Sequence, residues 1–236
     1  MASDFPVVFA LYPDVTQLDF TGPLEVLVRL PQARIVLAAT RGGELAAGGV
    51  TFAAVRELAR VSECALLCVP GGFGCAAAME DAEYLGALRR LAARARYVTS
   101  VCTGSLLLGA AGLLAGRRAA CHWAFRELLA LFGAIPDTRR VVRDGNLFTG
   151  GGVTAGIDMA LTVSAEIAGE DHAQAVQLAM EYAPEPPFGA GRPESARPEV
   201  LAAVRGRFER VWPERRAAAE RAAQALARGF APTERV

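Results

Sequence analysis

The sequence contains no lysine, and all 25 of its basic residues are arginine. This absence excludes Schiff-base catalysis, a pyridoxal phosphate site and a phosphate-binding loop that ends in lysine. The acidic residues also number 25, so the formal net charge at neutral pH is zero. A neutral chain has no general electrostatic attraction to nucleic acid, and we expect no nucleic-acid partner.

Histidine is scarce, and the cysteines follow no paired pattern. The chain has two histidines and an odd number of cysteines: Cys64, Cys68, Cys75, Cys102 and Cys121. No Cys-x-x-Cys pair occurs, so we expect neither a disulfide framework nor a metal site. No apolar run is long enough to span a membrane, and residues 1–4 lack the basic region of a secretory signal. These absences predict a cytoplasmic protein without a membrane partner.

Strand-like and helix-like segments alternate along most of the chain. Apolar runs predict strands at 6–12, 33–40, 64–69, 97–101 and about 118–122, with hairpins at 45–55 and 140–148. Helices are predicted at 24–30, 81–95, directly after Cys102, and at 125–132, 155–167 and 171–182. Thr21 is the expected cap of the helix at 24–30. This succession predicts an α/β fold with an open, mostly parallel sheet and helices on both faces.

The end of the chain has a different composition. From Glu199 to Ala227 alanine and arginine alternate with helical spacing, and bulky apolar residues are few. We therefore expect one α/β domain over residues 1–195 and a helical tail over residues 196–236. The tail lacks the bulk for a core of its own, so it is expected to pack on the domain or on a partner subunit.

Cys102 lies at the junction between the strand predicted at 97–101 and the helix that follows it. This position faces outward from the carboxyl end of a parallel strand, where open α/β sheets bind ligands. It also faces the free N–H groups of a helix start, which favour the thiolate, the nucleophilic form of cysteine. The alternative is a small buried cysteine that packs the end of the strand.

Asp19 stands between two apolar residues, Leu18 and Phe20, just after the first predicted strand. One interpretation is a helix-start carboxylate that accepts backbone hydrogen bonds. The other is a carboxyl group in an apolar pocket, with a raised pKa, that transfers protons during catalysis.

Two glycine-rich turns follow predicted strands. Pro70-Gly71-Gly72 ends the run at 64–69, and a second glycine run, at 150–152, precedes the helix predicted at 155–167. Glycines at such places let the backbone approach a ligand and present free N–H groups. A tight turn that requires positive φ explains the first pair equally well.

Four motifs taken together resemble the ThiJ/PfpI superfamily. They are Leu18-Asp19-Phe20-Thr21-Gly22-Pro23-Leu24-Glu25-Val26, Val69-Pro70-Gly71-Gly72, Ser100-Val101-Cys102-Thr103-Gly104 and Gly151-Gly152-Val153-Thr154-Ala155-Gly156-Ile157-Asp158. The resemblance covers about residues 5–195. Many members carry glutamate at the position of Asp19. Aspartate at this position makes the chain similar to the isocyanide-hydrating branch of the superfamily. The resemblance implies a flavodoxin-like, class I glutamine amidotransferase-like fold, a homodimer and no cofactor.

The resemblance also implies roles for individual residues. Cys102 is the expected nucleophile, Asp19 the carboxyl group beside it, and Thr103 the neighbour required for activity. The backbone N–H of Gly72 is expected to face the reacting centre, and that of Val153 to donate to the thiolate.

These residue types suit the hydration of an isocyanide, R–N≡C. Thiolate attack on the terminal carbon, followed by protonation of that carbon, gives a thioimidate on Cys102. Water then displaces the sulfur and yields an N-substituted formamide. A carboxyl group that holds a proton near neutral pH supplies the proton and activates the water. The expected partner is therefore a small isocyanide substrate.

Other functions remain open at this stage. Protease-like relatives carry histidine directly after the cysteine, and Thr103 at that position disfavours a peptidase. His122 aligns with a histidine near the site in some relatives, and we expect it to be structural. One alternative is a stress-response protein that acts on reactive carbonyls or senses oxidation through Cys102. Another is an effector-binding domain related to AraC-type regulators.

Overall fold

The computed structural model describes residues 4–229, and an eight-stranded sheet forms its centre. The strand order is β3-β4-β2-β1-β5-β6-β10-β9, in which β3 and β9 are antiparallel to their neighbours and the other pairings are parallel. The strands are β1 (Phe5–Ala10), β2 (Ala33–Ala39), β3 (Gly43–Ala47), β4 (Val50–Glu57), β5 (Leu66–Val69), β6 (Tyr97–Val101), β9 (Val141–Asp144) and β10 (Leu147–Gly150). The predicted open, mostly parallel sheet is confirmed.

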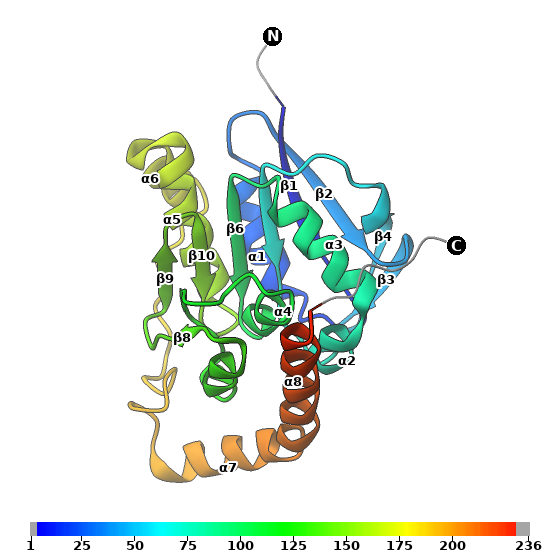
Figure 1. Ribbon diagram of the computed structural model, residues 1–236. Coiled ribbons are helices and arrows are strands. Elements are labelled where there is room, and N and C mark those ends of the chain that lie inside the picture. The colour runs from blue at the N-terminus through cyan, green and yellow to red at the C-terminus, as the bar shows by residue number, and fades with distance from the viewer. Residues whose placement is uncertain (1–3, 230–236) are drawn as a thin grey trace, which may run out of the picture.

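Helices cover both faces of this sheet (Figure 1). One face carries α1 (Leu18–Leu27), α5 (Ala155–Ala168) and α6 (Glu170–Ala179), and α1 packs directly on α5. The other face carries α2 (Cys75–Glu80), α3 (Ala82–Ala92), α4 (Gly104–Ala110) and the later helix α8 (Trp212–Ala227). The α/β class is therefore also confirmed.

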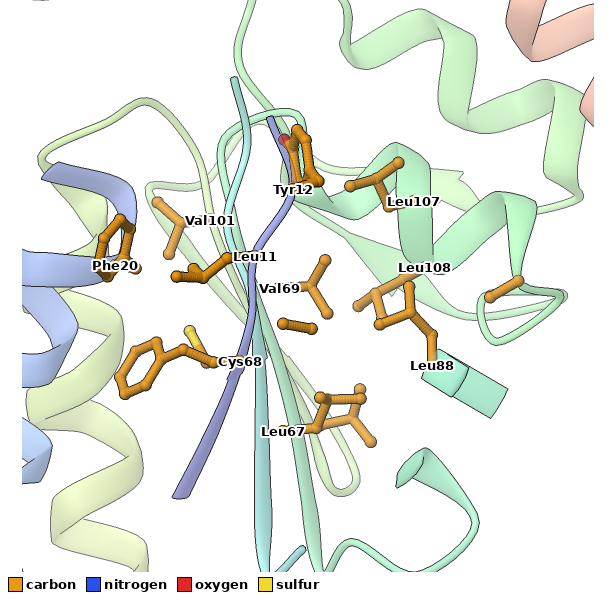
Figure 2. Close-up of a cluster of buried hydrophobic side chains, with 14 of the residues drawn as sticks. Leu11, Tyr12, Phe20, Leu67, Cys68, Val69, Leu88, Val101, Leu107 and Leu108 are labelled. Carbon is orange, nitrogen blue, oxygen red and sulfur yellow. The ribbon is translucent and has the colours of Figure 1, made fainter. Parts of the chain in front are cut away.

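The core follows from the alternation of side chains along the central strands. Each residue of β5 is completely buried, as expected for a strand with helices on both of its faces. Leu67 points toward Leu88 of α3, whereas Cys68 points to the side of Phe20 of α1 (Figure 2). The apolar run that predicted this strand therefore serves two separate core layers.

The first helix begins earlier than the sequence indicated. The predicted helix at 24–30 with Thr21 as its cap is wrong, because α1 starts at Leu18 after Gln17. The Thr21 hydroxyl instead donates to the Gln17 carbonyl oxygen, one turn back inside the helix, and Pro23 lies within the helix. Burial of Phe20 against the sheet outweighs the local preference for a start at proline.

Two other segments are shorter or tighter than predicted. The strand expected at 118–122 is reduced to β7 (Arg118–Ala119), which pairs with β8 (Ile135–Pro136) outside the main sheet. The helix expected at 125–132 is the 3₁₀ helix η2 (Arg126–Phe132), and a second 3₁₀ turn, η1 (Leu58–Arg60), follows β4. Gly133 ends η2 with a φ of +71°, a conformation that glycine adopts without strain.

The tail contains two helices rather than one. After α7 (Pro198–Glu209) the helix breaks at Arg210 and Val211, and α8 begins at Trp212. Pro213 has no N–H to donate to the carbonyl oxygen of Glu209, four residues back, and its ring would clash with that carbonyl group. Helix α7 has no buried residue, whereas α8 buries three alanines, Ala218, Ala219 and Ala222. Helix α8 packs against α2 and α4 (Figure 1). The last part of the predicted tail, residues 230–236, lies outside the described residues.

None of the helices within residues 4–229 has the length and apolar character needed to cross a membrane.

Candidate active site

The candidate residues converge at one edge of the sheet. Asp19 lies in the first turn of α1, Gly71 and Gly72 follow β5, Cys102 follows β6, and Val153 comes shortly after β10. The strands β5, β6 and β10 are parallel and end at this edge, and α1 follows the parallel strand β1, which ends there too. The chain leaves β1 toward β2 on one side and β5 lies on the other, so the site occupies the switch point of the sheet.

Cys102 adopts a strained conformation between β6 and α4. Its φ is +58°, in the left-handed region that residues with a side chain rarely adopt. The backbone N–H donates to the carbonyl oxygen of Gly150 at 3.1 Å, and the side chain is 6% exposed. Strain of this kind costs on the order of 1–3 kcal/mol and is typical of functional positions.

Gly104 lets α4 start directly beneath β5. A Cβ atom at this position would lie 2.0 Å from the carbonyl oxygen of Val69. Only glycine permits this approach, which places the start of the helix next to Cys102.

The environment of Cys102 favours the protonated thiol. Burial raises the pKa of the thiol, and the nearby Asp19 and Cys121 raise it further. The backbone N–H of Thr103 lowers the pKa, which is the effect predicted for a helix start, but burial outweighs it. A thiol in this environment would need a nearby base in order to act as a nucleophile.

Asp19 lies beside this thiol and is completely buried. Its Oδ2 atom accepts a hydrogen bond from the N–H of Gly71 at 2.9 Å, whereas Oδ1 has no hydrogen-bond partner among the described residues. Burial raises the pKa of Asp19 from 3.8 to about 7, although the Gly71 N–H and Cys102 oppose the rise. A carboxyl group with this pKa can both accept and donate a proton at neutral pH.

Thr103 connects the cysteine turn to the glycine turn. Its Oγ1 atom accepts a hydrogen bond from the N–H of Gly72 at 3.0 Å. The N–H of Gly72, which was expected to face the reacting centre, is therefore engaged with Thr103 in this structure. Gly71, which the sequence analysis assigned no role, supplies the N–H that contacts the carboxyl group.

The Gly71 position has no room for a side chain. A Cβ atom there would lie 2.5 Å from the backbone nitrogen of Thr103 and 2.9 Å from Oδ2 of Asp19. The glycine is thus required for close approach of two groups, which the sequence motif alone left undecided.

A cavity of about 680 Å³ opens next to this edge of the sheet. Cys121, His122 and residues 151–154 line one side of it, and Arg126, Arg139, Arg140 and Arg192 line other parts. Val153 lies in this wall, and the hydrogen bond expected from its N–H to a thiolate stays a prediction. The volume is within the range of small-molecule sites, but neither Cys102 nor Asp19 lines this cavity.

His122 stands in an aromatic environment beside the cavity. Its ring lies 5.1 Å from that of Phe208 and 5.6 Å from that of Trp123. Burial lowers the pKa of His122 to about 4, and two arginines, Arg215 and Arg126, contribute to the decrease. The imidazole is therefore neutral at physiological pH.

Two side chains that the sequence analysis missed contact the glycine turn. The Tyr12 hydroxyl donates to the Pro70 carbonyl oxygen at 3.1 Å, and Arg215 of α8 donates to the Gly72 carbonyl oxygen at 3.1 Å. Tyr12 follows the first strand, so its position was a usable signal. Arg215 is one of many arginines in the tail, and nothing local distinguishes it.

No group of three or more histidine, cysteine, aspartate or glutamate side chains within residues 4–229 could hold a metal ion. Cys102 is the candidate nucleophile and Asp19 the candidate acid–base group of the site, with Thr103 and the glycine turn hydrogen-bonded around them.

Comparison with known proteins agrees with this geometry. An isonitrile hydratase of Pseudomonas putida is 50% identical over 221 residues, which cover 92% of this chain and 96% of that protein. The crystal structure of a ThiJ/PfpI family protein from Pseudomonas syringae superposes with a TM-score of 0.87 at 39% identity, covering 97% of this chain and 92% of that one. The resemblance inferred from the four motifs is confirmed.

A transcriptional regulator of the helix-turn-helix type, CdhR of Pseudomonas aeruginosa, is also related. It is 31% identical over 174 residues, which cover 72% of this chain but 49% of the regulator. The family model described as DJ-1/PfpI matches residues 6–166. Since this match includes Asp19, the glycine turn and Cys102, and most of the sheet with them, the chain belongs to the DJ-1/PfpI family.

Proposed function

We propose that this protein hydrates isocyanides to N-substituted formamides through a covalent thioimidate on Cys102. The observation that carries the proposal is the buried pair of Cys102 and Asp19, in which the carboxyl group has a pKa of about 7. Similarity to an isonitrile hydratase along nearly the full length of both chains supports the same reaction.

In the first step the Cys102 thiol adds across the isocyanide carbon. The Asp19 carboxylate accepts the thiol proton while sulfur bonds to the terminal carbon, and the carboxyl group then gives that proton to the same carbon. The product is R–N=CH–S–Cys102, and the carboxylate is restored. The free Oδ1 atom of Asp19 is the oxygen available for this transfer, since Oδ2 is bonded to Gly71.

In the second step water releases the product. Asp19 accepts a proton from water as the water oxygen attacks the thioimidate carbon, and it passes that proton to the nitrogen. The tetrahedral intermediate R–NH–CH(OH)–S–Cys102 then expels the sulfur, Asp19 carries the hydroxyl proton to it, and R–NH–CHO leaves. The pKa of Asp19 allows the same group to act as base and as acid in turn.

The neighbouring groups position this pair. The Gly71 N–H orients the carboxyl group, and Thr103 holds the glycine turn through the Gly72 N–H. The backbone N–H of Val153 is proposed to donate to the sulfur whenever it is charged. The protein is further proposed to act as a cytoplasmic homodimer that needs no cofactor.

An oxidation sensor is a weaker interpretation of the same site. The thiolate is the form of cysteine that peroxides oxidise, and the raised pKa of Cys102 leaves little thiolate at neutral pH. Hydration does not require a standing thiolate, because Asp19 removes the proton during the attack.

The test is formamide production from cyclohexyl isocyanide by the purified protein. We expect N-cyclohexylformamide, and in D₂O the product should carry deuterium at the formyl carbon, because that hydrogen comes from the exchangeable Asp19–Cys102 pair. Cys102→Ala is the matched control and should give none. Equal production by wild type and Cys102→Ala would refute the proposal.

A further inference from the structure

Arg215 is a buried cation in a helix that lies far along the chain from the rest of the site. It belongs to α8, and the residue is 4% exposed. Its Nη2 atom donates to the carbonyl oxygens of Gly72 at 3.1 Å and Phe73 at 3.3 Å. The guanidinium carbon lies 4.2 Å from the ring centroid of Phe125, a cation–π contact.

No carboxylate among the described residues forms an ion pair with this guanidinium, and its buried Nε atom has no hydrogen-bond partner there. Arg221, on the same helix, shows the ordinary arrangement: it pairs with Glu80 of α2, and both side chains are largely exposed. Burial of an arginine without a carboxylate is costly. The contacts of Arg215 therefore indicate a role that Arg221 does not share.

The carbonyl groups that Arg215 binds belong to the turn that organises the site. On the other side of this turn, the Gly72 N–H donates to Thr103 and the Gly71 N–H donates to Asp19. Arg215 thus binds the carbonyl groups of the peptide units 72–73 and 73–74. These units directly follow the units 70–71 and 71–72, whose N–H groups contact Asp19 and Thr103.

We propose that Arg215 is a positioning residue for the reaction at Cys102, and that helix α8 is part of the active site through this contact. The guanidinium holds the turn at residues 71–73 in the conformation that aims Asp19 and Thr103. The expected effect of Arg215 on turnover rests on the proposed function. Its expected effect on the reactivity of the Cys102 thiol rests on the geometry alone.

In addition to its hydrogen bonds, Arg215 brings a positive charge close to two thiols. The cation lowers the pKa of Cys75 and Cys121, and the Cys75 thiol in turn donates to the Thr103 carbonyl oxygen at 3.5 Å. The titratable and charged groups around this centre are Tyr12, Asp19, Cys75, Cys121, His122 and Arg126. Since His122 is neutral, Arg215 is the cation with hydrogen bonds to the turn itself.

The experiment compares Arg215→Met, Arg215→Lys and Arg221→Met, with folding verified by circular dichroism. Methionine keeps much of the apolar stem but removes the charge and the donors. We expect Arg215→Met to lower kcat at least about tenfold with KM changed less than about threefold, since small displacements of catalytic groups cost this much. Arg215→Lys retains a charged donor and should recover most of kcat. Arg221→Met removes the other polar tie of α8 and should match wild type.

A second readout does not depend on isocyanide turnover. Alkylation of Cys102 by iodoacetamide between pH 6 and 9 should be slower in Arg215→Met than in wild type, because the turn that orients Asp19 and Thr103 beside the thiol is no longer held in place. If the wild type makes no formamide, the proposed function fails while this readout still tests the role of Arg215. A folded Arg215→Met variant with wild-type kcat, or with the wild-type alkylation profile, overturns the inference.

An equal loss in Arg221→Met also overturns it, because simple docking of the helix would then explain the effect. Should Arg215→Met fail to fold, Arg215→Gln replaces it, since glutamine keeps a neutral donor, and the same comparison applies.

Discussion

The buried carboxyl group of Asp19 makes a quantitative prediction about stability. Its pKa is raised from 3.8 to about 7 in the folded protein, which corresponds to about 4 kcal/mol at 1.36 kcal/mol for each pKa unit. Below pH 3.8 the carboxyl group is protonated in both states and costs nothing. As the pH rises toward 7, the unfolded chain releases this proton while the folded protein retains it, so the free energy of unfolding falls.

Asp19→Asn removes this pH-dependent decrease in the free energy of unfolding. The amide oxygen can still accept the hydrogen bond from Gly71, and the residue stays neutral at every pH. The variant should therefore gain stability relative to wild type as the pH rises. We expect a gain of about 1–2 kcal/mol between pH 4 and 5, about 4 kcal/mol by pH 7, and little change above pH 8.

The measurement is urea denaturation of both proteins at pH 4, 5, 6, 7 and 8. Other titrating groups are common to the two chains and cancel in the difference. The same Asp19→Asn variant should make no formamide, because an amide transfers no proton. A difference in unfolding free energy that is constant with pH, or that favours wild type at high pH, would mean that Asp19 is an ordinary helix-start carboxylate, as the alternative interpretation of the sequence holds.

Four further outcomes are expected. Cys102→Ser should lose formamide production almost completely because an alkoxide is not available at neutral pH, whereas Cys64→Ala should retain it. Gly71→Ala should lower kcat at least about tenfold, because its Cβ would lie 2.5 Å from the backbone nitrogen of Thr103; the matched change Gly86→Ala, in an open helical position, should not lower it. Light scattering at micromolar concentration should give twice the chain mass of 24.8 kDa, and a monomer would contradict the homodimer. Gel-shift assays with duplex DNA should show no specific complex, and a salt-sensitive shift with one particular duplex would favour a regulator instead.

Local patterns were sufficient to predict most of the sheet and the position of Cys102 between a strand and a helix. The run at 64–69 is apolar throughout, as is typical of strands with helices on both faces, and it contains β5. The run at 97–101 is rich in β-branched residues, although Thr99 and Ser100 are polar, and it became β6. The change from β-branched residues to a small-residue helix start predicted the turn at Cys102. The hairpin around Gly145 and the helix from Ala155 were likewise predicted from local signals.

Long-range contacts decided the features that local patterns did not predict. Helix α1 starts at Leu18 although Pro23 suggests a later start, because burial of Phe20 against the sheet outweighs the helix-start preference. The pKa of Cys102 is a second case. The sequence shows the helix start that lowers it, but burial, which raises it more, depends on the helices packed around the site.

The sequence by itself determined the succession of strands and helices along most of the chain and the residues that end β5 and β6, because both depend on periodicity within a few residues. The tertiary structure alone decided that the Gly72 N–H serves Thr103, that Gly71 orients Asp19, and that Arg215 is buried. Arg215 and Gly72 are 143 positions apart, and the tail offers many similar arginines. Which of them enters the site is set by how α8 docks on α2 and α4, since burial of a charged side chain depends on its surroundings rather than on its neighbours in sequence.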